Sequence, residues 1–208
     1  VRQNLLENQT SQEDARQSFG LEPDKKTVLI VGGSLGARTV NESVLAHLDD
    51  IRKSNVQFIW QTGKYYSQSI SEALEKSEAV PNLKVMDFIG CMDYAYAAAD
   101  LVVSRAGASS ISELCLLGKP CVLVPSPNVA EDHQTQNALA LSSKDAAIFV
   151  ADKEAKEKLV QTALETVTND ERLLSLSENV KKLAFLNSSD IIAEEVYKLA
   201  VEYKKRNN

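Results

Sequence analysis

Short apolar runs alternate along the chain with longer segments of helical periodicity. Several of these runs are apolar at every position, which is typical of strands in a parallel sheet that helices cover on both faces. The runs that predict strands are 28–31, 57–61, 83–88, 101–104, 121–125 and 147–150. The segments that predict helices between them are 38–50, 65–76, 92–98, 110–117 and 133–142. We therefore expect an α/β fold with a doubly wound, six-stranded parallel sheet.

The two ends of the chain carry helical patterns without strands. Residues 10–13 offer capping groups for a short helix that Gly20 can close, and we expect this helix to pack outside the sheet. Acidic and basic residues interleave from 152 to about 205, which predicts two or three amphipathic helices. We expect one domain over 1–208, divided into a linker and N-terminal helix (1–27), the sheet core (28–151) and the C-terminal helices (152–208).

Composition narrows the class of protein. A chain of 208 residues with 44% hydrophobic content can form one good core. Its 23 basic and 29 acidic residues give a net charge of -6, the wrong sign for neutralising nucleic-acid phosphates, so nucleic acid is not an expected partner. Cys91, Cys115 and Cys121 lack CxxC spacing, and we expect them to be reduced core residues of a cytosolic protein. The chain starts at Val1, which favours an expressed piece of a longer protein.

A glycine-rich loop, GGSLGA at 32–37, follows the first predicted strand. Gly32, Gly33 and Gly36 let backbone N–H groups approach an anion at the N-terminus of the next helix, so the loop predicts a phosphate or diphosphate site. A tight turn without a ligand would require the same glycines. The P-loop spacing GxxxxGK[ST] and the dinucleotide fingerprint GxGxxG are both absent, which disfavours a nucleoside triphosphatase and an NAD enzyme.

A second glycine-bearing turn, SRAGASSISE at 104–113, follows the fourth predicted strand. Ligands of open α/β sheets bind beyond the carboxyl ends of the strands, so the loops after the first and fourth strands can face one crevice. In that arrangement the turn at Gly107 presents free amides to a phosphate, and Glu113 accepts hydrogen bonds from a ribose diol. The alternative is a capping box, in which Ser110 and Glu113 satisfy amides of the first helical turn.

A third candidate site is the polar sequence DHQTQN that begins at Asp132 and opens a predicted helix. Polar groups at that edge of the sheet can bind a sugar, whereas the alternative is a solvated first turn capped by Asp132. His47 and His133 lie far apart without a ligand cluster, and a DxD pair is missing, so we expect no metal and no other cofactor. A bound diphosphate would then be neutralised mainly by helix termini and amides.

Four motifs together resemble one family: VLIVGGSLGA, FIG at Phe88, SRAGASSISEL and GKPCVLVPSPNVAEDHQTQNA. Their order and spacing are similar to those of the C-terminal domain of the MurG family, the N-acetylglucosaminyltransferases of bacterial peptidoglycan synthesis. The resemblance covers nearly the whole chain and is densest over 28–150. It implies a Rossmann-like domain, one half of a GT-B glycosyltransferase, that binds the donor UDP-N-acetylglucosamine.

The resemblance also implies a donor contact for each matching residue. By motif position, Ser34 contacts the diphosphate, Ile89 offers backbone hydrogen bonds to uracil, and Glu113 binds the ribose hydroxyls. The other implied donor contacts are Ala108, Ser109 and Ser110 to the phosphates, Gln134 to the hydroxyls of the sugar ring, and Arg2 from the interdomain linker.

The implied reaction is an inverting transfer. The C4 hydroxyl of the muramyl sugar in an undecaprenyl-linked acceptor attacks the anomeric carbon of the donor, and UDP leaves, stabilised by oriented amides and helix N-termini. We find no convincing catalytic base in this chain, so we expect the base, the acceptor and the membrane contact to belong to a missing N-terminal domain. The isolated chain would bind donor without turnover, and the full-length protein would be cytoplasmic and peripheral to the plasma membrane. A donor-binding subunit of a two-component glycosyltransferase and a UDP-sugar epimerase domain remain alternatives.

Overall fold

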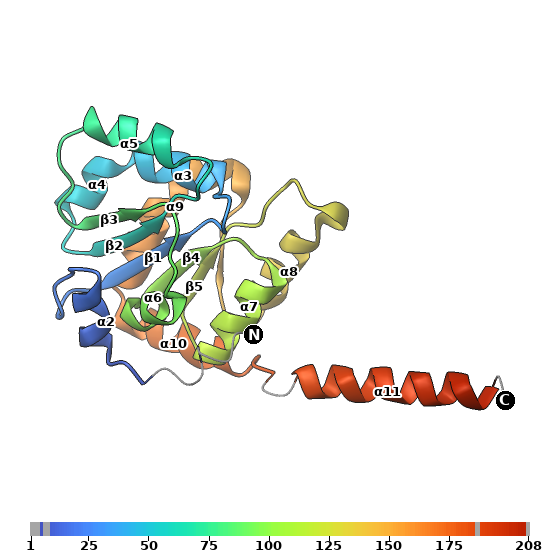
Figure 1. The fold of residues 1–208 in the computed structure, drawn as a ribbon. Coiled ribbons are helices and arrows are strands. Elements are labelled where there is room, and N and C mark those ends of the chain that lie inside the picture. The colour runs from blue at the N-terminus through green and yellow to red at the C-terminus, as the bar shows by residue number, and fades with distance from the viewer. Residues whose placement is uncertain (1–4, 6–8, 186–187, 207–208) are drawn as a thin grey trace.

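The fold is a doubly wound α/β sandwich (Figure 1). The computed structural model describes residue 5, residues 9–185 and residues 188–206. One parallel sheet has the strand order β3-β2-β1-β4-β5-β6. Its strands are β1 (Thr27–Val31), β2 (Gln57–Gln61), β3 (Leu83–Met86), β4 (Leu101–Ser104), β5 (Cys121–Leu123) and β6 (Ile148–Phe149). Because the chain runs outward from β1 to β3 and then returns to β4 on the other side of β1, the strand order reverses between β1 and β4, where such sheets bind ligands.

Helices cover both faces of this sheet. Those between the strands are α3 (Arg38–Ala46), α4 (Leu48–Lys53), α5 (Ser67–Glu75), α6 (Met92–Ala98), α7 (Ala108–Leu117) and α8 (His133–Ser142). Side chains alternate between the two faces of each strand, so Leu29 and Val31 join a core with α6 and α7. Val28 and Ile30 join a second core with α3 and with α9 (Asp152–Val167). The predicted sheet and its two covered faces are confirmed.

Some predicted boundaries shift. The helix predicted over 38–50 is divided at His47, whose backbone (φ -122, ψ 27) leaves the helical region and separates α3 from α4. The strand predicted over 121–125 ends at Leu123, since Pro125 has no amide hydrogen to continue a ladder. The helices predicted over 92–98 and 133–142 have the expected bounds.

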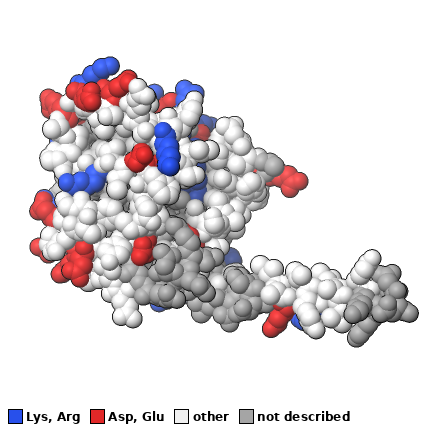
Figure 2. Space-filling view, in the orientation of Figure 1, with Lys and Arg blue, Asp and Glu red and all other residues white. Residues whose placement is uncertain are grey.

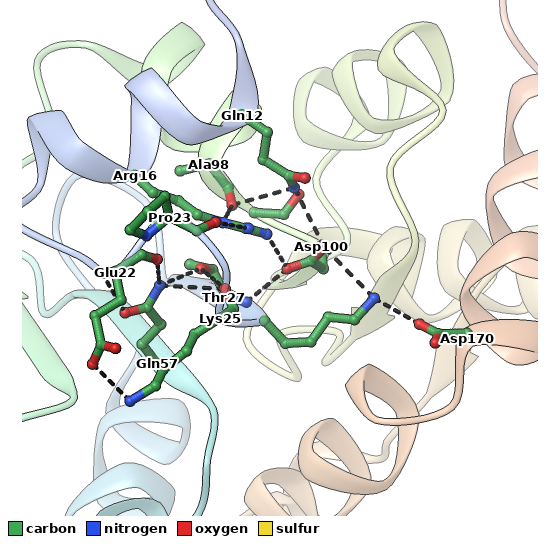
Figure 3. A network of polar contacts seen from close by, with 12 residues as sticks. Gln12, Arg16, Glu22, Pro23, Lys25, Thr27, Gln57, Ala98, Asp100 and Asp170 are labelled. Atoms are coloured by element: carbon green, nitrogen blue, oxygen red, sulfur yellow. Dashed lines mark hydrogen bonds and ion pairs between the residues drawn. The ribbon is translucent and has the colours of Figure 1, made fainter.

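The N-terminal helix α2 (Gln12–Ser18) packs against α6, outside the sheet. The Ser11 hydroxyl caps it by accepting from the Asp14 amide at 3.1 Å, and Gly20 (φ +65) lies just beyond its C-terminus. Figure 3 shows the polar network that anchors this helix. The Arg16 guanidinium forms a 2.7 Å ion pair with Asp100, and the same carboxylate accepts from the Thr27 amide at 2.7 Å. The network thus ties α2 to the amino ends of β1 and β4, away from the loops that follow the strands.

Three helices follow the sheet: α9, α10 (Asp170–Lys181) and α11 (Ser188–Arg206). In Figure 1, α11 extends away from the rest of the domain. Its exposed apolar side chains are Ile191, Ile192, Val196, Tyr197, Leu199 and Tyr203. Among the described residues, no helix combines the length and apolar character that a membrane span requires.

The cysteines are only in part the core residues that the sequence predicts. Cys115 and Cys121 are buried, and burial raises the pKa of both thiols. Cys91 is exposed, contrary to the prediction, because it lies in the loop between β3 and α6, directly before the first turn of α6.

Candidate functional site

A cavity of about 520 Å³ lies where β1 and β4 end. Its walls come from the ends of β1, β2 and β4, the loops after β1 and β3, and the facing sides of α6 and α7. The lining residues are Val31, Gly33, Ser34, Gln61, Phe88, Ile89, Met92, Tyr96, Ser104, Arg105, Gly107, Ser109, Ser110 and Glu113. The structure therefore brings the segments around Ser34 and Glu113 to one cavity, at the point where the strand order reverses.

The glycine loop after β1 is held by the loop after β2. Gly36 has φ +88, and a Cβ there would lie 2.2 Å from the Thr62 carbonyl oxygen. Gly63 packs against Gly36 in the same way, since its Cβ would lie 2.1 Å from the Gly36 nitrogen. The Gln61 carboxamide donates to the Gly33 carbonyl at 3.1 Å. Two glycine turns thus lie backbone to backbone, which fixes the loop that carries the predicted phosphate contacts.

The four glycines of the predicted phosphate loops divide into two groups. Gly33 and Gly107 line the cavity, whereas Gly32 and Gly36 do not. Gly32 allows a close approach within the loop, because a Cβ on it would lie 2.5 Å from the Ala37 nitrogen. Gly32 and Gly36 therefore shape the loop rather than face the cavity.

Helix α7 begins at Ala108, two residues before the predicted start at Ser110. Gly107 takes the N-cap position, and no side chain caps the helix there. The capping-box interpretation of Ser110 and Glu113 is therefore wrong, since Ser110 already lies inside the first turn. Glu113 is instead 6% exposed, and its Oε2 accepts a hydrogen bond from the Tyr96 hydroxyl at 3.0 Å. A buried carboxylate thus lies in the wall of a cavity that also contains a helix N-terminus.

The loop between β3 and α6 forms another wall. Ile89 is 1% exposed and belongs to the core under the cavity, whereas Phe88 is half-exposed beside it. The Lys64 ammonium lies 5.5 Å from the centre of the Phe88 ring, within the range of a cation–π contact. An aromatic ring beside an apolar floor suits a flat, partly apolar group such as a nucleobase.

The charge of the lining is low. Arg105 contributes a guanidinium, but that group forms an ion pair with Asp152 and donates to the carbonyls of Val124 (3.2 Å) and Pro125 (3.1 Å). Its positive charge is thus already paired, which leaves backbone amides and the start of α7 as the groups that face an anion. Within the described ranges, no group of three or more His, Cys, Asp or Glu side chains is placed to hold a metal ion.

Charges on the outer surface are also mixed. Figure 2 shows Lys and Arg side chains scattered among acidic ones, without a continuous basic patch on the described part of that face. This distribution differs from the clustered basic footprint of nucleic-acid-binding proteins.

Besides Gly32 and Gly36, two predicted site residues, Gln134 and Ala108, do not line the cavity. The Oε1 of Gln134 accepts from the Ser126 amide at 2.9 Å, so this side chain holds the loop after β5. Ala108 lines a separate cavity of about 370 Å³ on the other side of α7. Arg2 lies outside the described residues. Asp132 precedes α8 as predicted but caps no amide, and its carboxylate accepts from the Thr135 hydroxyl at 2.6 Å.

Several residues of the lining were not predicted from the sequence. Gln61 ends a predicted strand, so its place at the carboxyl edge of the sheet was a usable signal. Arg105 stands within the motif that carries Gly107, and its charge was a second usable signal. Tyr96 gave none, because its spacing in α6 is that of an ordinary core position.

A doubly wound sheet with a glycine turn, a helix N-terminus and a buried carboxylate around one switch-point cavity is typical of Rossmann-like α/β domains that bind nucleotides. The family model of the glycosyltransferase family 28 C-terminal domain matches residues 27–194. The chain belongs to this family.

Two relatives in this family share one name. The UDP-N-acetylglucosamine--N-acetylmuramyl-(pentapeptide) pyrophosphoryl-undecaprenol N-acetylglucosamine transferase of Bacteroides fragilis is 61% identical over 201 residues, which are 96% of this chain and 53% of the relative. The protein of the same name from Phocaeicola vulgatus is 58% identical over 207 residues, 100% of this chain and 55% of the relative. The chain thus spans about half the length of the curated relatives it matches.

Solved structures agree with this assignment. Acinetobacter baumannii MurG is 28% identical with a TM-score of 0.74, over 91% of this chain and 53% of that one. The UDP-GlcNAc 2-epimerase of Neisseria meningitidis, bound to UDP-GlcNAc, is 15% identical with a TM-score of 0.67 over 94% of this chain and 51% of its own, which shows a shared fold alone. The resemblance to the MurG family and the Rossmann-like fold class are confirmed.

Proposed function

We propose that this chain is the donor-binding half of an inverting N-acetylglucosaminyltransferase that converts lipid I to lipid II in peptidoglycan synthesis. The observation that carries the proposal is the cavity at the end of β1 and β4, where the Ser34 loop, the start of α7 and the buried Glu113 converge. Its volume of about 520 Å³ falls within the range of about 300–1,000 Å³ that is usual for small-molecule sites. The named relatives supply the substrate class.

The uridine diphosphate of the donor fits the chemistry of this cavity. The diphosphate lies against the Ser34 loop and the start of α7, where Ser109 and Ser110 offer amides and hydroxyls. Each helix N-terminus contributes about 0.3–2 kcal/mol to binding an anion. Glu113 accepts hydrogen bonds from the ribose hydroxyls, and the backbone of Ile89 binds uracil. No metal or other cofactor is needed for this arrangement, because amides and helix ends stabilise the leaving diphosphate.

The proposed donor contacts of Gln134 and Ala108 depend on which polar atoms each residue can offer. Gln134 already uses its carboxamide oxygen on Ser126, so it meets the hydroxyls of N-acetylglucosamine as a donor through its Nε2. Ala108 has no polar side chain, so its contact with the phosphates is made by its backbone amide. Arg2, which lies outside the described residues, stays a predicted donor contact.

The whole enzyme requires a second half. There the C4 hydroxyl of the muramyl sugar attacks the anomeric carbon of the donor while UDP departs, and a base removes the hydroxyl proton. We assign the base, the undecaprenyl-linked acceptor and the membrane contact to the N-terminal domain of the full-length protein. That protein acts at the cytoplasmic face of the plasma membrane.

Calorimetric titration tests donor binding directly. We expect the wild-type chain to bind UDP and UDP-N-acetylglucosamine. Glu113→Ala removes a charged acceptor, and hydrogen bonds to charged groups contribute about 1.5–3 kcal/mol, so UDP should bind about 10- to 150-fold more weakly. The matched control is Glu75→Ala, at an exposed position of α5, which should bind as the wild type does.

Two results would contradict the proposal: a wild-type chain that does not bind UDP, or a Glu113→Ala variant that binds it with unchanged affinity. Full-length enzyme given UDP-N-acetylglucosamine without an acceptor tests the reaction type. It should release no 2-epimer, because transfer needs the acceptor, whereas an epimerase needs only the nucleotide sugar.

A further inference from the structure

Tyr96 and Glu113 form a buried contact between two helices that the sequence separates. Tyr96 lies on α6 and is 3% exposed, and Glu113 lies on α7 and is 6% exposed. The Tyr96 hydroxyl donates to Glu113 Oε2 at 3.0 Å, and both side chains line the cavity between the ends of β1 and β4.

The direction of this hydrogen bond has a chemical consequence. An ionised carboxylate only accepts hydrogen bonds, and it has two oxygens with about four acceptor positions. A phenol that donates to Oε2 occupies one of these positions and restricts the rotation of the carboxylate plane. A carboxylate held in this way meets two vicinal hydroxyls without first losing rotamer freedom.

We propose that Tyr96 is a positioning residue: its hydroxyl fixes the Glu113 carboxylate in the orientation that accepts from the vicinal diol of a ribose, so that the cavity selects a ribonucleotide over its 2′-deoxy counterpart. This inference rests on the proposed function, because it deepens the role of Glu113 in the same site. Tyr96 touches the carboxylate, and its effect on the nucleotide is transmitted by Glu113.

The affinity ratio between UDP and 2′-deoxy-UDP separates this role from simple packing. A residue that only fills space in α6 would affect both nucleotides alike when it is altered. A residue that orients the carboxylate affects UDP more strongly, because UDP offers the carboxylate two vicinal hydroxyls and 2′-deoxy-UDP offers it one. Because the ratio compares two ligands on one preparation, it is insensitive to a change in the folded fraction of a variant.

The experiment is calorimetric titration of both nucleotides into the 208-residue wild type, Tyr96→Phe, Glu113→Gln and the double variant. The wild type should bind UDP at least tenfold more tightly than 2′-deoxy-UDP. Tyr96→Phe should weaken UDP about tenfold and 2′-deoxy-UDP less than twofold. The double variant should bind UDP no more weakly than Glu113→Gln alone, since the two residues act as one unit. Tyr94→Phe, at an exposed position of the same helix, is the matched control and should keep the wild-type ratio.

The outcomes distinguish the inference from the function on which it rests. If Tyr96→Phe keeps the wild-type ratio, or weakens both nucleotides equally while Glu113→Gln lowers the ratio, the positioning role is overturned and donor binding stands. If the wild type binds neither nucleotide, both the proposed function and this inference are overturned.

Discussion

Asn41 joins helix α3 to the strand and loop that support the glycine turn. Its side chain is buried, at 3% exposure. The Asn41 Oδ1 accepts from the Trp60 indole N–H at 3.0 Å, and its Nδ2 donates to the Thr62 carbonyl at 2.8 Å. The same Thr62 carbonyl lies against Gly36, so one carboxamide braces the contact between the two glycine turns.

Replacing Asn41 with leucine removes both hydrogen bonds and keeps a similar volume. The Trp60 N–H and the Thr62 carbonyl then lose their partner inside the protein. Each orphaned buried group costs about 1–3 kcal/mol, so the free energy of unfolding should fall by about 2–6 kcal/mol. This is a large share of the roughly 5–15 kcal/mol that stabilises a typical domain.

Urea unfolding followed by fluorescence measures this loss. Trp60 is the single tryptophan of the chain, and it is fully buried, so its emission reports the unfolding of β2 and its surroundings. Asn55→Ala, at an exposed position, is the control and should stay within about 0.5 kcal/mol of the wild type. A loss of less than about 1 kcal/mol in Asn41→Leu would refute the argument that this carboxamide satisfies two buried groups.

Three further predictions address the site and its frame. Gly36→Ala should lower the melting temperature more than Gly33→Ala. A Cβ at Gly36 would lie 2.2 Å from a backbone carbonyl oxygen, whereas a Cβ at Gly33, which has a similar φ of +84, would meet open space. Equal melting temperatures of the two variants would contradict this. Lys119→Met should be more stable than the wild type at pH 7, since burial lowers the pKa of the Lys119 ammonium from 10.5 to about 8. Between about pH 8 and pH 10.5 the unfolded chain therefore keeps a proton on Lys119 that the folded chain has lost. The wild type therefore gains stability as the pH rises through this window, and urea unfolding at pH 7 and pH 10.5 should show the advantage of the variant shrink. Arg172 lowers the pKa of the exposed Asp145 carboxyl below 3.8, so the pair stabilises the fold above that pH and its contribution is lost as the pH falls further. Asp145→Asn should show a weaker dependence of melting temperature on pH below 4, and an unchanged profile would argue against the ion pair.

Much of this fold follows from hydrophobic periodicity. The bounds of β2, β4, α6 and α8 match their predictions. The meeting of Ser34 and Glu113 was also predictable, since it needs only the rule that parallel strands end at one edge of the sheet. The break between α3 and α4 at His47 depends on backbone geometry alone, so hydrophobic periodicity could not predict it.

Contacts between side chains that lie far apart in the chain could not be predicted from the sequence. The spacing of Ser110 and Glu113 fits a capping box, and only the earlier start of α7 at Ala108, with Gly107 as the N-cap, shows that Glu113 is used otherwise. Its partner, Tyr96, lies on another helix, and nothing in the local sequence pairs the two. The same holds for Gln134, whose bond to the Ser126 amide depends on how the loop after β5 folds back on α8.

A crystal structure of this chain with UDP would show whether the cavity at the ends of β1 and β4 is the donor site. We expect the diphosphate between the Ser34 loop and the start of α7, and a ribose hydroxyl within about 2.5–3.2 Å of the Glu113 carboxylate. UDP bound elsewhere, for example in the cavity beside Ala108 on the other side of α7, would contradict it.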